Sequence, residues 1–348
     1  MVRYSEDYWK DVREVLSFVP NVELLFNKHI LITGATGMIG SSVAELLFEL
    51  NKRKNANIKI MLAGRSLMRM KARFYCFTEG LDYSFVEYDA TKGDTLNVYA
   101  DYIIHGASPA DPASFAKQPV ETMFANFLGL RSLLELCKHN SNVRLLYISS
   151  SEVYGKKDVL EPYYENSYGF VDILNPRACY PSAKRAAETL CSAYKDEFGI
   201  DFVVVRPGHI YGPTITDSDS RASAQFTRKA TAGEDIVLKS AGNQLRSYTY
   251  TLDCASAILT VLINGTTGEA YNISNSQSVV TIRDLAENIA KFAGVNVVFA
   301  QASQLELKSY NMMENSSLSS EKLERLGWKS FYNLEKGVNA TCEFYTNC

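Results

Sequence analysis

The sequence has few of the features that mark extracellular, metal-binding or membrane-embedded proteins. Its seven cysteines are scattered without a CxxC pair, and its four histidines do not stand at metal-ligand spacing. We therefore expect reduced thiols, no metal site and a cytoplasmic location. The first fifteen residues carry charges throughout, and the least charged stretch, residues 30–44, is too short to cross a bilayer. We expect neither a signal peptide nor a membrane segment.

The sequence also lacks a large excess of one charge. The formal net charge is -3, so the chain has no broad positive field, and nucleic acid or an anionic membrane surface is not expected as its main partner. Any anion that it binds must be held by local groups. The 348 residues, 46% of them hydrophobic, are enough for one large domain or two closely joined domains.

Short apolar runs alternate with helical patterns from residue 29 onward. Near-continuous apolar strands separated by helices are typical of a parallel sheet that is covered on both faces. We therefore predict an α/β fold with a doubly wound parallel (Rossmann) sheet over residues 29–205. The predicted strands lie at 29–33, 58–63, 84–88, 102–105, 144–149 and 202–206.

The two ends of the chain have different patterns. Residues 1–28 predict a helical N-terminal extension that packs on the main domain. The residues expected on its apolar face are Tyr8, Val12, Val15 and Leu16. After residue 205 the pattern becomes irregular, which predicts a smaller C-terminal substrate-binding lobe over 206–348, with some segments returning to the Rossmann domain.

Three glycines follow the first predicted strand in the segment GATGMIG. Gly34 permits a tight turn, Gly37 lets backbone amides approach a pyrophosphate, and Gly40 lets the next helix pack closely on the strand. This spacing predicts a dinucleotide cradle, although a purely structural turn would also explain it. The cradle residues expected to contact the dinucleotide are Gly34, Thr36, Gly37, Met38, Ile39 and Gly40.

Later strand ends fit the same pocket. Asp89, followed by Ala90, could accept a hydrogen bond from the adenine amino group, or could simply cap the strand end. Ala107 and Ser108 are small residues where the ribose of the cofactor would approach the backbone. The second strand ends in Arg65 without an acidic residue for the ribose hydroxyls. Arg65 could pair with a 2'-phosphate, which leaves NADP open beside NAD, or could be a solvated surface residue.

Tyr180 and Lys184 stand four residues apart in a helical segment, so they project from one face. A tyrosine has a pKa of about 10, and a cation within ~4–6 Å can lower that pKa by roughly 1–3 units. We therefore expect Lys184 to make the phenol of Tyr180 a base near neutral pH. This spacing also occurs by chance in many helices. The hydroxyl groups of SSSEVYG, at 149–155, are expected at the same sheet edge and bring Ser150 into the candidate site.

Together these segments resemble the extended short-chain dehydrogenase/reductases, which are NAD-dependent sugar epimerases, dehydratases and decarboxylases. The resemblance begins at about Lys28 and includes the glycine loop, HGASP, SSSEVYG, YPSAK, RPGHIYGP and EKLERLGW. It implies that Ser150, Tyr180 and Lys184 form the proton-transfer set, that Lys184 also holds the nicotinamide ribose, and that Pro207 contacts the cofactor. It also implies a homodimer formed through a four-helix bundle, with helices at about 115–139 and 180–198 in each subunit.

The resemblance implies a substrate and a first step: hydride is removed from a sugar carbon, usually C4, of a nucleotide-diphosphate sugar. The 4,6-dehydratases have an Asp-Glu pair where this chain has Ser151 and Glu152, and simple 4-epimerases usually lack a carboxylate at the position of Glu152. Ser-Glu before VYG is similar to the UDP-glucuronate decarboxylases. There, oxidation at C4 gives a β-keto acid, which loses carbon dioxide with little help beyond orientation and a proton.

This likeness favours UDP-glucuronate decarboxylation. Nucleotide-sugar 4-epimerisation and 4,6-dehydration are the alternatives, and a non-catalytic dinucleotide sensor would be a different class. Ser151 and Glu152 would orient the carboxylate-bearing carbon, while Arg221 and Arg246 would contact the diphosphate or the sugar. Glu152 could instead bond a helix N-terminus, and Arg246 could belong to a surface ion pair.

His209 departs from the family pattern. Members commonly have Asn at this position, which contacts the diphosphate of the nucleotide sugar, so we count His209 with the substrate contacts. A histidine there could signal a changed nucleotide or sugar.

Overall fold

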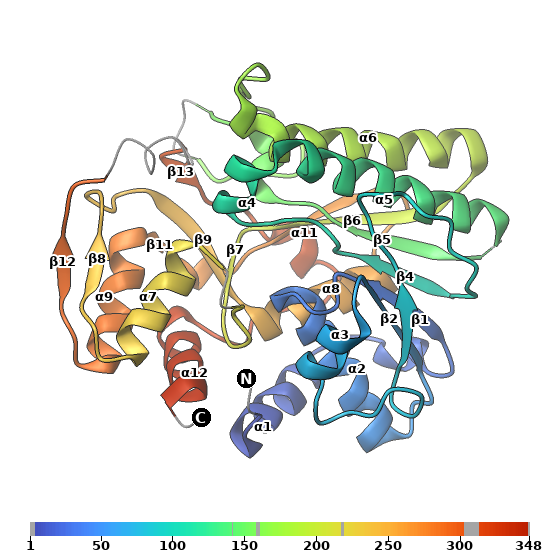
Figure 1. Cartoon of the computed structure of the whole chain (residues 1–348), viewed down its shortest axis with the longest axis horizontal. Helices are drawn as coiled ribbons and strands as arrows, with labels where there is room; N and C mark the ends of the chain where they lie inside the picture. The colour runs from blue at the N-terminus through green and yellow to red at the C-terminus, as the bar shows by residue number, and fades with distance from the viewer. Residues whose placement is uncertain (1–3, 141, 158–160, 217–218, 303–312, 347–348) are drawn as a thin grey trace.

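The largest part of the fold is a parallel sheet of seven strands in the order β10-β6-β5-β4-β1-β2-β3 (Figure 1). The computed structural model describes residues 4–140, 142–157, 161–216, 219–302 and 313–346. The strand order reverses between β1 and β4, as in dinucleotide-binding folds. This arrangement confirms the predicted doubly wound sheet. The strands are β1 (His29–Thr33), β2 (Lys59–Gly64), β3 (Ser84–Glu87), β4 (Tyr102–His105), β5 (Arg144–Ile148), β6 (Asp201–Pro207) and β10 (Ala270–Ile273).

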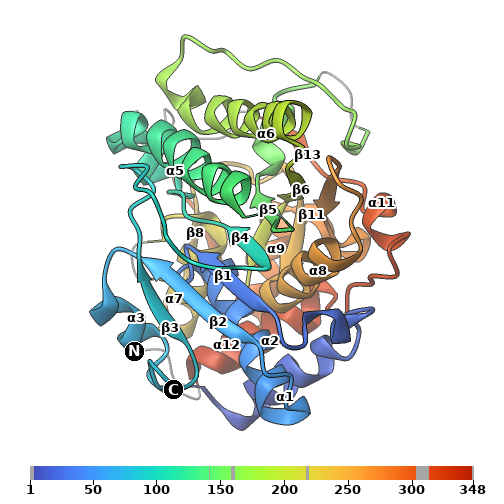
Figure 2. The same ribbon diagram turned by 90° about the vertical axis from the view of Figure 1, so that its right-hand side faces the viewer.

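Different helices cover the two faces of this sheet (Figures 1 and 2). Helices α5 (Pro119–His139) and α6 (Cys179–Phe198) lie over one face, and α2 (Met38–Lys54) and α8 (Thr251–Asn264) cover the other. Side chains of β1 alternate accordingly, because Leu31 belongs to the α5 and α6 core and Ile30 and Ile32 to the opposite one. The edge strand β3 differs from the predicted continuous burial, since Ser84 and Glu87 are exposed.

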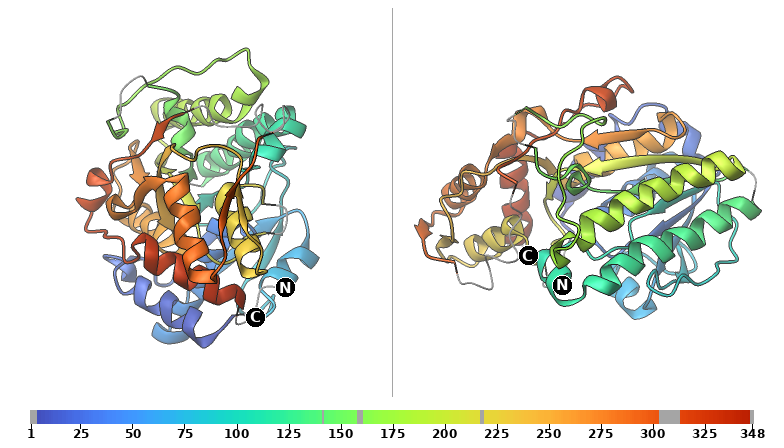
Figure 3. Two further views of the ribbon diagram at one scale, coloured as in Figure 1. Left: turned by 90° about the vertical axis from the view of Figure 1, so that its left-hand side faces the viewer. Right: turned by 90° about the horizontal axis from the view of Figure 1, so that it is seen from above.

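A smaller group of elements lies beside the sheet (Figure 1, left; Figure 3, left). Strand β9 pairs with β7, β11 and β13, and β8 pairs with β12. Most of the chain after residue 207 belongs to this group, but α8 and β10 pack in or against the large sheet. Its strands are β7 (His209–Tyr211), β8 (Ile236–Leu238), β9 (Leu245–Tyr250), β11 (Val279–Thr281), β12 (Val297–Phe299) and β13 (Asn315–Ser316). Its helices are α7 (Ala222–Thr231), α9 (Ile282–Ala293) and α12 (Leu334–Thr346), whereas the short α11 (Glu321–Glu324) contacts β10 of the large sheet. No helix in the described ranges combines the length and apolar character needed to cross a membrane.

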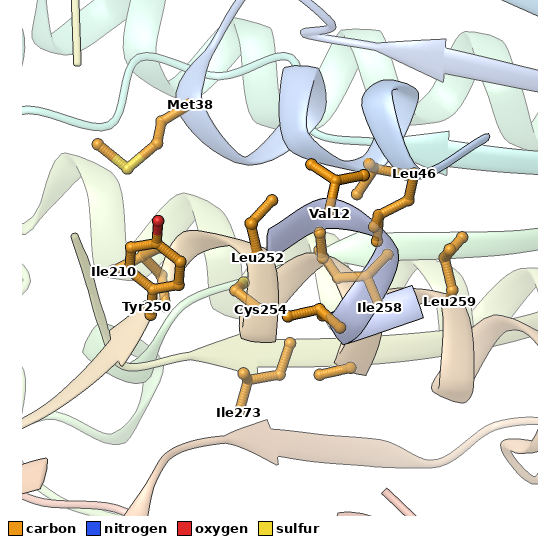
Figure 4. Close-up of a cluster of buried hydrophobic side chains, with 14 of the residues drawn as sticks. Val12, Met38, Leu46, Ile210, Tyr250, Leu252, Cys254, Ile258, Leu259 and Ile273 are labelled. Atoms are coloured by element: carbon orange, nitrogen blue, oxygen red, sulfur yellow. The ribbon is translucent and has the colours of Figure 1, made fainter. Parts of the chain in front are cut away.

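The N-terminal segment forms helix α1 (Glu6–Leu16), which packs against α2 and α8. Its buried residues are the four that the sequence placed on one face, Tyr8, Val12, Val15 and Leu16. In Figure 4, Val12 of α1 lies among apolar side chains of α2 and α8, close to Leu46 and Ile258.

Glu45 of α2 is fully buried, and both oxygens of its carboxyl group are hydrogen-bonded. Arg73, the last residue of α3 (Leu67–Arg73), donates to Glu45 Oε1 at 2.7 Å. The hydroxyl of Tyr4 donates to the same oxygen at 2.5 Å, and the hydroxyl of Tyr8 donates to Oε2. Residues of the N-terminal segment therefore complete the hydrogen bonding of a buried ion pair next to the glycine-loop helix.

We predict that Arg73→Met lowers the free energy of unfolding by about 3–5 kcal/mol, because it leaves the carboxylate of Glu45 buried without its cation. Urea unfolding measures this loss. The double variant Glu45→Met, Arg73→Met should lose less than the single variant. Arg325→Met, which removes an exposed ion pair with Glu321, is the control and should change little. Equal losses in the Arg73 and Arg325 variants would contradict the prediction.

Candidate active site

The glycine turn after β1 has the geometry that a dinucleotide cradle needs. Gly34 has φ +70°, and a Cβ there would lie 2.6 Å from the backbone of Gly106. Helix α2 begins after Gly37 without a side-chain cap, so the N–H groups of its first turn remain available for a pyrophosphate. A Cβ on Gly40 would lie 2.5 Å from the oxygen of Gly34. Gly40 therefore lets α2 start against the turn itself, not against the strand as predicted.

The remaining loop residues line the start of α2. Thr36 and Ile39 are half-buried and Met38 is buried. The sulfur of Met38 lies 3.8 Å from Nη2 of Arg221. The glycine loop thus borders the segment that opens α7.

One carboxylate oxygen of Asp89 caps the turn that follows β3. Oδ1 accepts hydrogen bonds from the amide of Thr91 at 3.0 Å and from its hydroxyl at 2.7 Å. Within the described ranges Oδ2 has no hydrogen-bond partner, so both interpretations of Asp89 are compatible with the structure. Burial raises the pKa of Asp89, but the Thr91 bonds and the charges of Arg65 and Lys92 outweigh it and lower that pKa. Arg65 itself is exposed.

The other predicted cofactor contacts are partly engaged in the fold. The Ser108 hydroxyl donates to Pro109 O and accepts from Asn126, both at 2.8 Å. The amide of Ala107 donates to Thr33 Oγ1 at 3.3 Å. Two further residues, Ala90 and Pro207, are buried.

Ser150, Glu152 and Tyr180 come together beyond the end of β5. Ser150 is the N-cap of a short 3-10 helix, η2 (Ser151–Tyr154), and its Oγ accepts from the amide of Glu152 at 3.2 Å. The hydroxyl of Ser150 also lies close to the buried phenol of Tyr180 and acts to lower its pKa. Lys184 is buried one turn further along α6, where Nζ donates to Ile148 O at 2.6 Å and lies 5.7 Å from the centre of the Tyr180 ring.

The expected effect of Lys184 on Tyr180 is wrong for these surroundings. Burial, followed by the charge of Glu152, raises the pKa of Tyr180 to about 12, although Ser150, Arg221 and Arg177 act in the lowering direction. Burial also lowers the pKa of Lys184 to about 7, so its ammonium is only partly charged near neutral pH. An ammonium that is only partly charged lowers the pKa of a neighbouring phenol less than a full positive charge would.

Glu152 is held by an arginine that the sequence analysis did not select. Arg177 lies in the 3-10 helix η3 (Pro176–Ala178) and donates to both carboxylate oxygens, with Nη1 to Oε2 at 3.0 Å and Nη2 to Oε1 at 2.9 Å. The carboxylate of Glu152 is therefore neither a free base nor bonded to a helix N-terminus. Ser151, the predicted companion of Glu152, is buried.

The two arginines predicted to bind an anion, Arg221 and Arg246, differ in how many protein groups they already bind. Arg221 forms a close pair with Asp219, with Nη2 to Oδ2 at 2.6 Å, and donates to Ile210 O. Arg246 is only 3% exposed and donates to the carbonyl of its neighbour Leu245. No carboxylate of the described residues lies within ion-pair distance of Arg246, so this guanidinium is the more available of the two. It is not a surface ion-pair member.

His209 is close enough to both arginines for their charges to affect its pKa, and it is neutral near pH 7. Burial, followed by the charges of Arg246 and Arg221, lowers the pKa of His209 to about 3. Its Nδ1 is buried without a hydrogen-bond partner in the described structure, and its ring meets that of Tyr248 edge-on at 5.8 Å. A neutral imidazole contributes no charge of its own to an anion site.

Phe115 and His105 also belong to the site, although sequence reasoning missed them. Phe115, in α4 (Pro112–Lys117), stacks on Tyr180 with 4.4 Å between ring centres. His105 ends β4, pairs with Thr33 Oγ1 at 2.7 Å, and has its pKa lowered to about 3 by burial and by Lys184. His105 stands in the HGASP motif, so the motif could have identified it as a site residue. Nothing local in the sequence links Phe115 to Tyr180.

Comparison with known proteins identifies the family. The model of the NAD dependent epimerase/dehydratase family matches residues 30–274. This chain belongs to that family. The match covers the glycine turn, the Ser150 and Tyr180 group and the whole large sheet, and the family name specifies NAD, one of the two dinucleotides that the sequence left open.

Members of this family with named activities are similar over most of the chain. UDP-glucuronic acid decarboxylase 1 of Xenopus tropicalis is 29% identical over 320 residues, covering 91% of this chain and 72% of the relative. UDP-glucuronic acid decarboxylase 3 of Arabidopsis thaliana is 28% identical over 312 residues, covering 90% and 87%. These relatives agree with the predicted resemblance to UDP-glucuronate decarboxylases.

Solved structures of epimerases and dehydratases share the fold. UDP-glucuronic acid 4-epimerase of Bacillus cereus, in complex with UDP-glucuronic acid and NAD, gives a TM-score of 0.76 at 22% identity, covering 92% of this chain and 99% of the other. The dTDP-glucose 4,6-dehydratase of Bacillus anthracis, in complex with NAD, gives 0.75 at 21% identity, covering 92% and 97%. At these identities the likeness establishes the fold.

We predict that Gly34→Ala weakens NAD binding by on the order of 10-fold or more, because its Cβ would displace the Gly106 backbone that closes the turn. Titration calorimetry with NAD measures this. Gly294→Ala is a matched control, because Gly294 has φ +69° but no atom within 4 Å of the place that a Cβ would take. It should cost some stability and leave NAD affinity unchanged. Similar NAD affinities in the two variants would contradict the proposed cradle.

Proposed function

We propose that this family member oxidises C4 of a nucleotide-diphosphate sugar with bound NAD, and that its reaction is the decarboxylation of UDP-glucuronate. The observation that carries this proposal is the bidentate bond between Arg177 and Glu152. A 4,6-dehydratase needs a free carboxylate to take the C5 proton and an acid to expel the C6 hydroxyl. Here the carboxylate is paired, and Ser151 stands in place of the acid. Loss of carbon dioxide from a β-keto acid needs neither group.

The site residues have separate roles in this proposal. When bound, NAD would accept the hydride from C4 and return it to C4 after carbon dioxide has left and C5 has taken a proton, so that the dinucleotide is regenerated and the product is a UDP-pentose. Tyr180 takes the proton of the C4 hydroxyl, and Ser150, which lies close to that phenol and acts to lower its pKa, helps to orient it. Lys184 fixes the end of β5 through Ile148 O. Tyr180 later returns its proton to the product.

The smaller group of strands and helices after residue 207 is proposed as the substrate lobe. Arg246 is its strongest candidate for the diphosphate, because a buried guanidinium without a carboxylate gains most from a phosphate oxygen. Arg221 and Arg246 both act on the pKa of the neutral His209, so the three side chains belong to one region of this lobe. Ser151 and Glu152 face the carboxylate-bearing carbon in this arrangement.

Incubation of the NAD-loaded protein with UDP-glucuronate is expected to release carbon dioxide and a UDP-pentose. Mass spectrometry of the product separates the rival reactions, since epimerisation conserves mass and dehydration removes water. Tyr180→Phe should abolish turnover and leave NAD binding nearly unchanged. An active NAD-loaded preparation that releases no carbon dioxide from UDP-glucuronate would exclude the decarboxylase. Parallel loss of NAD binding in Tyr180→Phe would mean that the tyrosine is structural.

We also propose a homodimer that forms through α5 and α6, which lie side by side on the outer surface (Figure 3, right). The first helix of the predicted pair, expected at about 115–139, is shorter in the structure, because α5 begins only after Gln118. Four apolar side chains on α5 are exposed at i, i+3, i+4 and i+7 spacing, which is typical of a helix face that packs on another helix. They are Val120 (56%), Met123 (44%), Phe124 (51%) and Phe127 (40%).

We also propose a cytoplasmic location, because the cysteines of the described chain are unpaired.

Phe124→Asp is expected to convert the dimer to a monomer, because it places a charge in the centre of an apolar contact. Light scattering coupled to size-exclusion chromatography measures the mass. Leu81→Asp is the control, since Leu81 is 82% exposed near the β3 edge, away from α5. A wild-type monomer, or an unchanged mass in Phe124→Asp, would contradict the proposed interface.

A further inference from the structure

Five residues at the candidate site lie next to one another in a ring. Arg177 donates two hydrogen bonds to Glu152, and its guanidinium carbon lies 4.8 Å from the centre of the Phe115 ring. Phe115 stacks on Tyr180 at an interplanar angle of 19°. Tyr180 lies close to Ser150, which acts to lower its pKa, and Oγ of Ser150 accepts from the amide of Glu152. Arg177 thus contacts both Glu152 and the aromatic support of Tyr180.

The pair between Arg177 and Glu152 removes a net negative charge from the place where a second carboxylate would bind. Their side chains are only 17% and 20% exposed, so water screens the charge of Glu152 weakly. An unpaired Glu152 would repel a uronate carboxylate, because two carboxylates that share one site disfavour double ionisation. The bidentate bond makes the pair neutral and fixes its orientation.

Stability alone does not account for this arginine. Buried ion pairs often contribute little net stability, because both ions lose hydration. In addition, Nε of Arg177 is buried without a hydrogen-bond partner among the described residues, and such an unpaired donor costs free energy. A local cost of this kind is characteristic of functional sites.

We propose that Arg177 is a positioning residue that selects a carboxylate-bearing sugar, because it neutralises Glu152 and, through Phe115, fixes the ring of Tyr180. This inference rests on the proposed function, in which a uronic acid binds beside Glu152. It adds a specificity determinant to that site. Arg177 acts through Glu152 and Phe115 and is not assigned a step in the reaction.

The ring also makes a prediction for pH dependence. The groups that act on the pKa of Tyr180 are Glu152 of η2, Ser150, Arg221 just before α7 and Arg177 of η3, and Lys184 lies on the next turn of α6. Glu152 raises the pKa of Tyr180, and Arg177 lowers it. Loss of Arg177 therefore raises this pKa further. Since the base form of Tyr180 is the deprotonated one, the acidic limb of the kcat profile should move to higher pH in Arg177→Met.

Binding of two sugars to the NAD-loaded protein tests the selection directly. Arg177→Met should weaken UDP-glucuronate binding by on the order of 10- to 100-fold and UDP-glucose binding by much less, as expected for the loss of a hydrogen-bonded charge. Titration calorimetry measures both affinities. Arg185→Met is the matched control, because Arg185 also holds η2 but donates to the carbonyl oxygens of Val153 and Tyr154. Its effect should be equal for the two sugars.

A double variant keeps the test decisive if Arg177→Met folds poorly. Glu152→Gln, Arg177→Met carries no unpaired carboxylate and should recover most of the UDP-glucuronate affinity. Equal weakening of both sugars in Arg177→Met, or no recovery in the double variant, would overturn the inference, as would a wild type that does not prefer UDP-glucuronate to UDP-glucose. Because binding needs no turnover, a wild type that binds UDP-glucuronate selectively without releasing carbon dioxide contradicts the proposed reaction, and the role of Arg177 is then still decided by the affinities of the variants.

Discussion

A carboxylate can lie beside a buried phenol only where a nearby cation balances its charge. In this chain Arg177 supplies the balance for Glu152, and both side chains are mostly buried. The same guanidinium stacks on Phe115, which supports the ring of Tyr180. The position of the carboxylate and the orientation of the phenol therefore depend on one arginine. The preference for decarboxylation over dehydration rests on the same constraint, because a paired carboxylate is a poor base.

The fold could be predicted from the sequence where a local pattern decides the structure. Strands β1 and β4 were predicted with their observed bounds, because each is a continuous apolar run that is buried on both faces. Strand β10 was not predicted, because it is short and contains Asn272, which is fully buried. Asn272 bonds the Tyr154 hydroxyl and Tyr163 O, at 2.5 and 2.9 Å. Hydrogen-bond partners more than one hundred residues away in the sequence allow this polar side chain to be buried. A local sequence pattern cannot predict such partners.

The candidate site divides in the same way. Its glycine turn and the groups at the ends of strands could be located by spacing, because parallel strands bring their carboxyl ends to one edge. The contact between Phe115 and Tyr180 could not, since it depends on how α4 meets α6. The pKa of Tyr180 was predicted in the wrong direction for a related reason. Four-residue spacing places Lys184 near Tyr180, but the burial that governs both pKa values is a property of the assembled fold.

The cations around Tyr180 therefore serve mainly to fix geometry. Lys184 holds the end of β5 through Ile148 O, and Arg177 holds Glu152 and Phe115. Their charges do not overcome the burial of the phenol, whose pKa is about 12. A further positive charge close to the ring would lower this pKa and favour the base form. An oxidised nicotinamide carries such a charge and a reduced one does not, so the strength of the base would depend on the redox state of the dinucleotide.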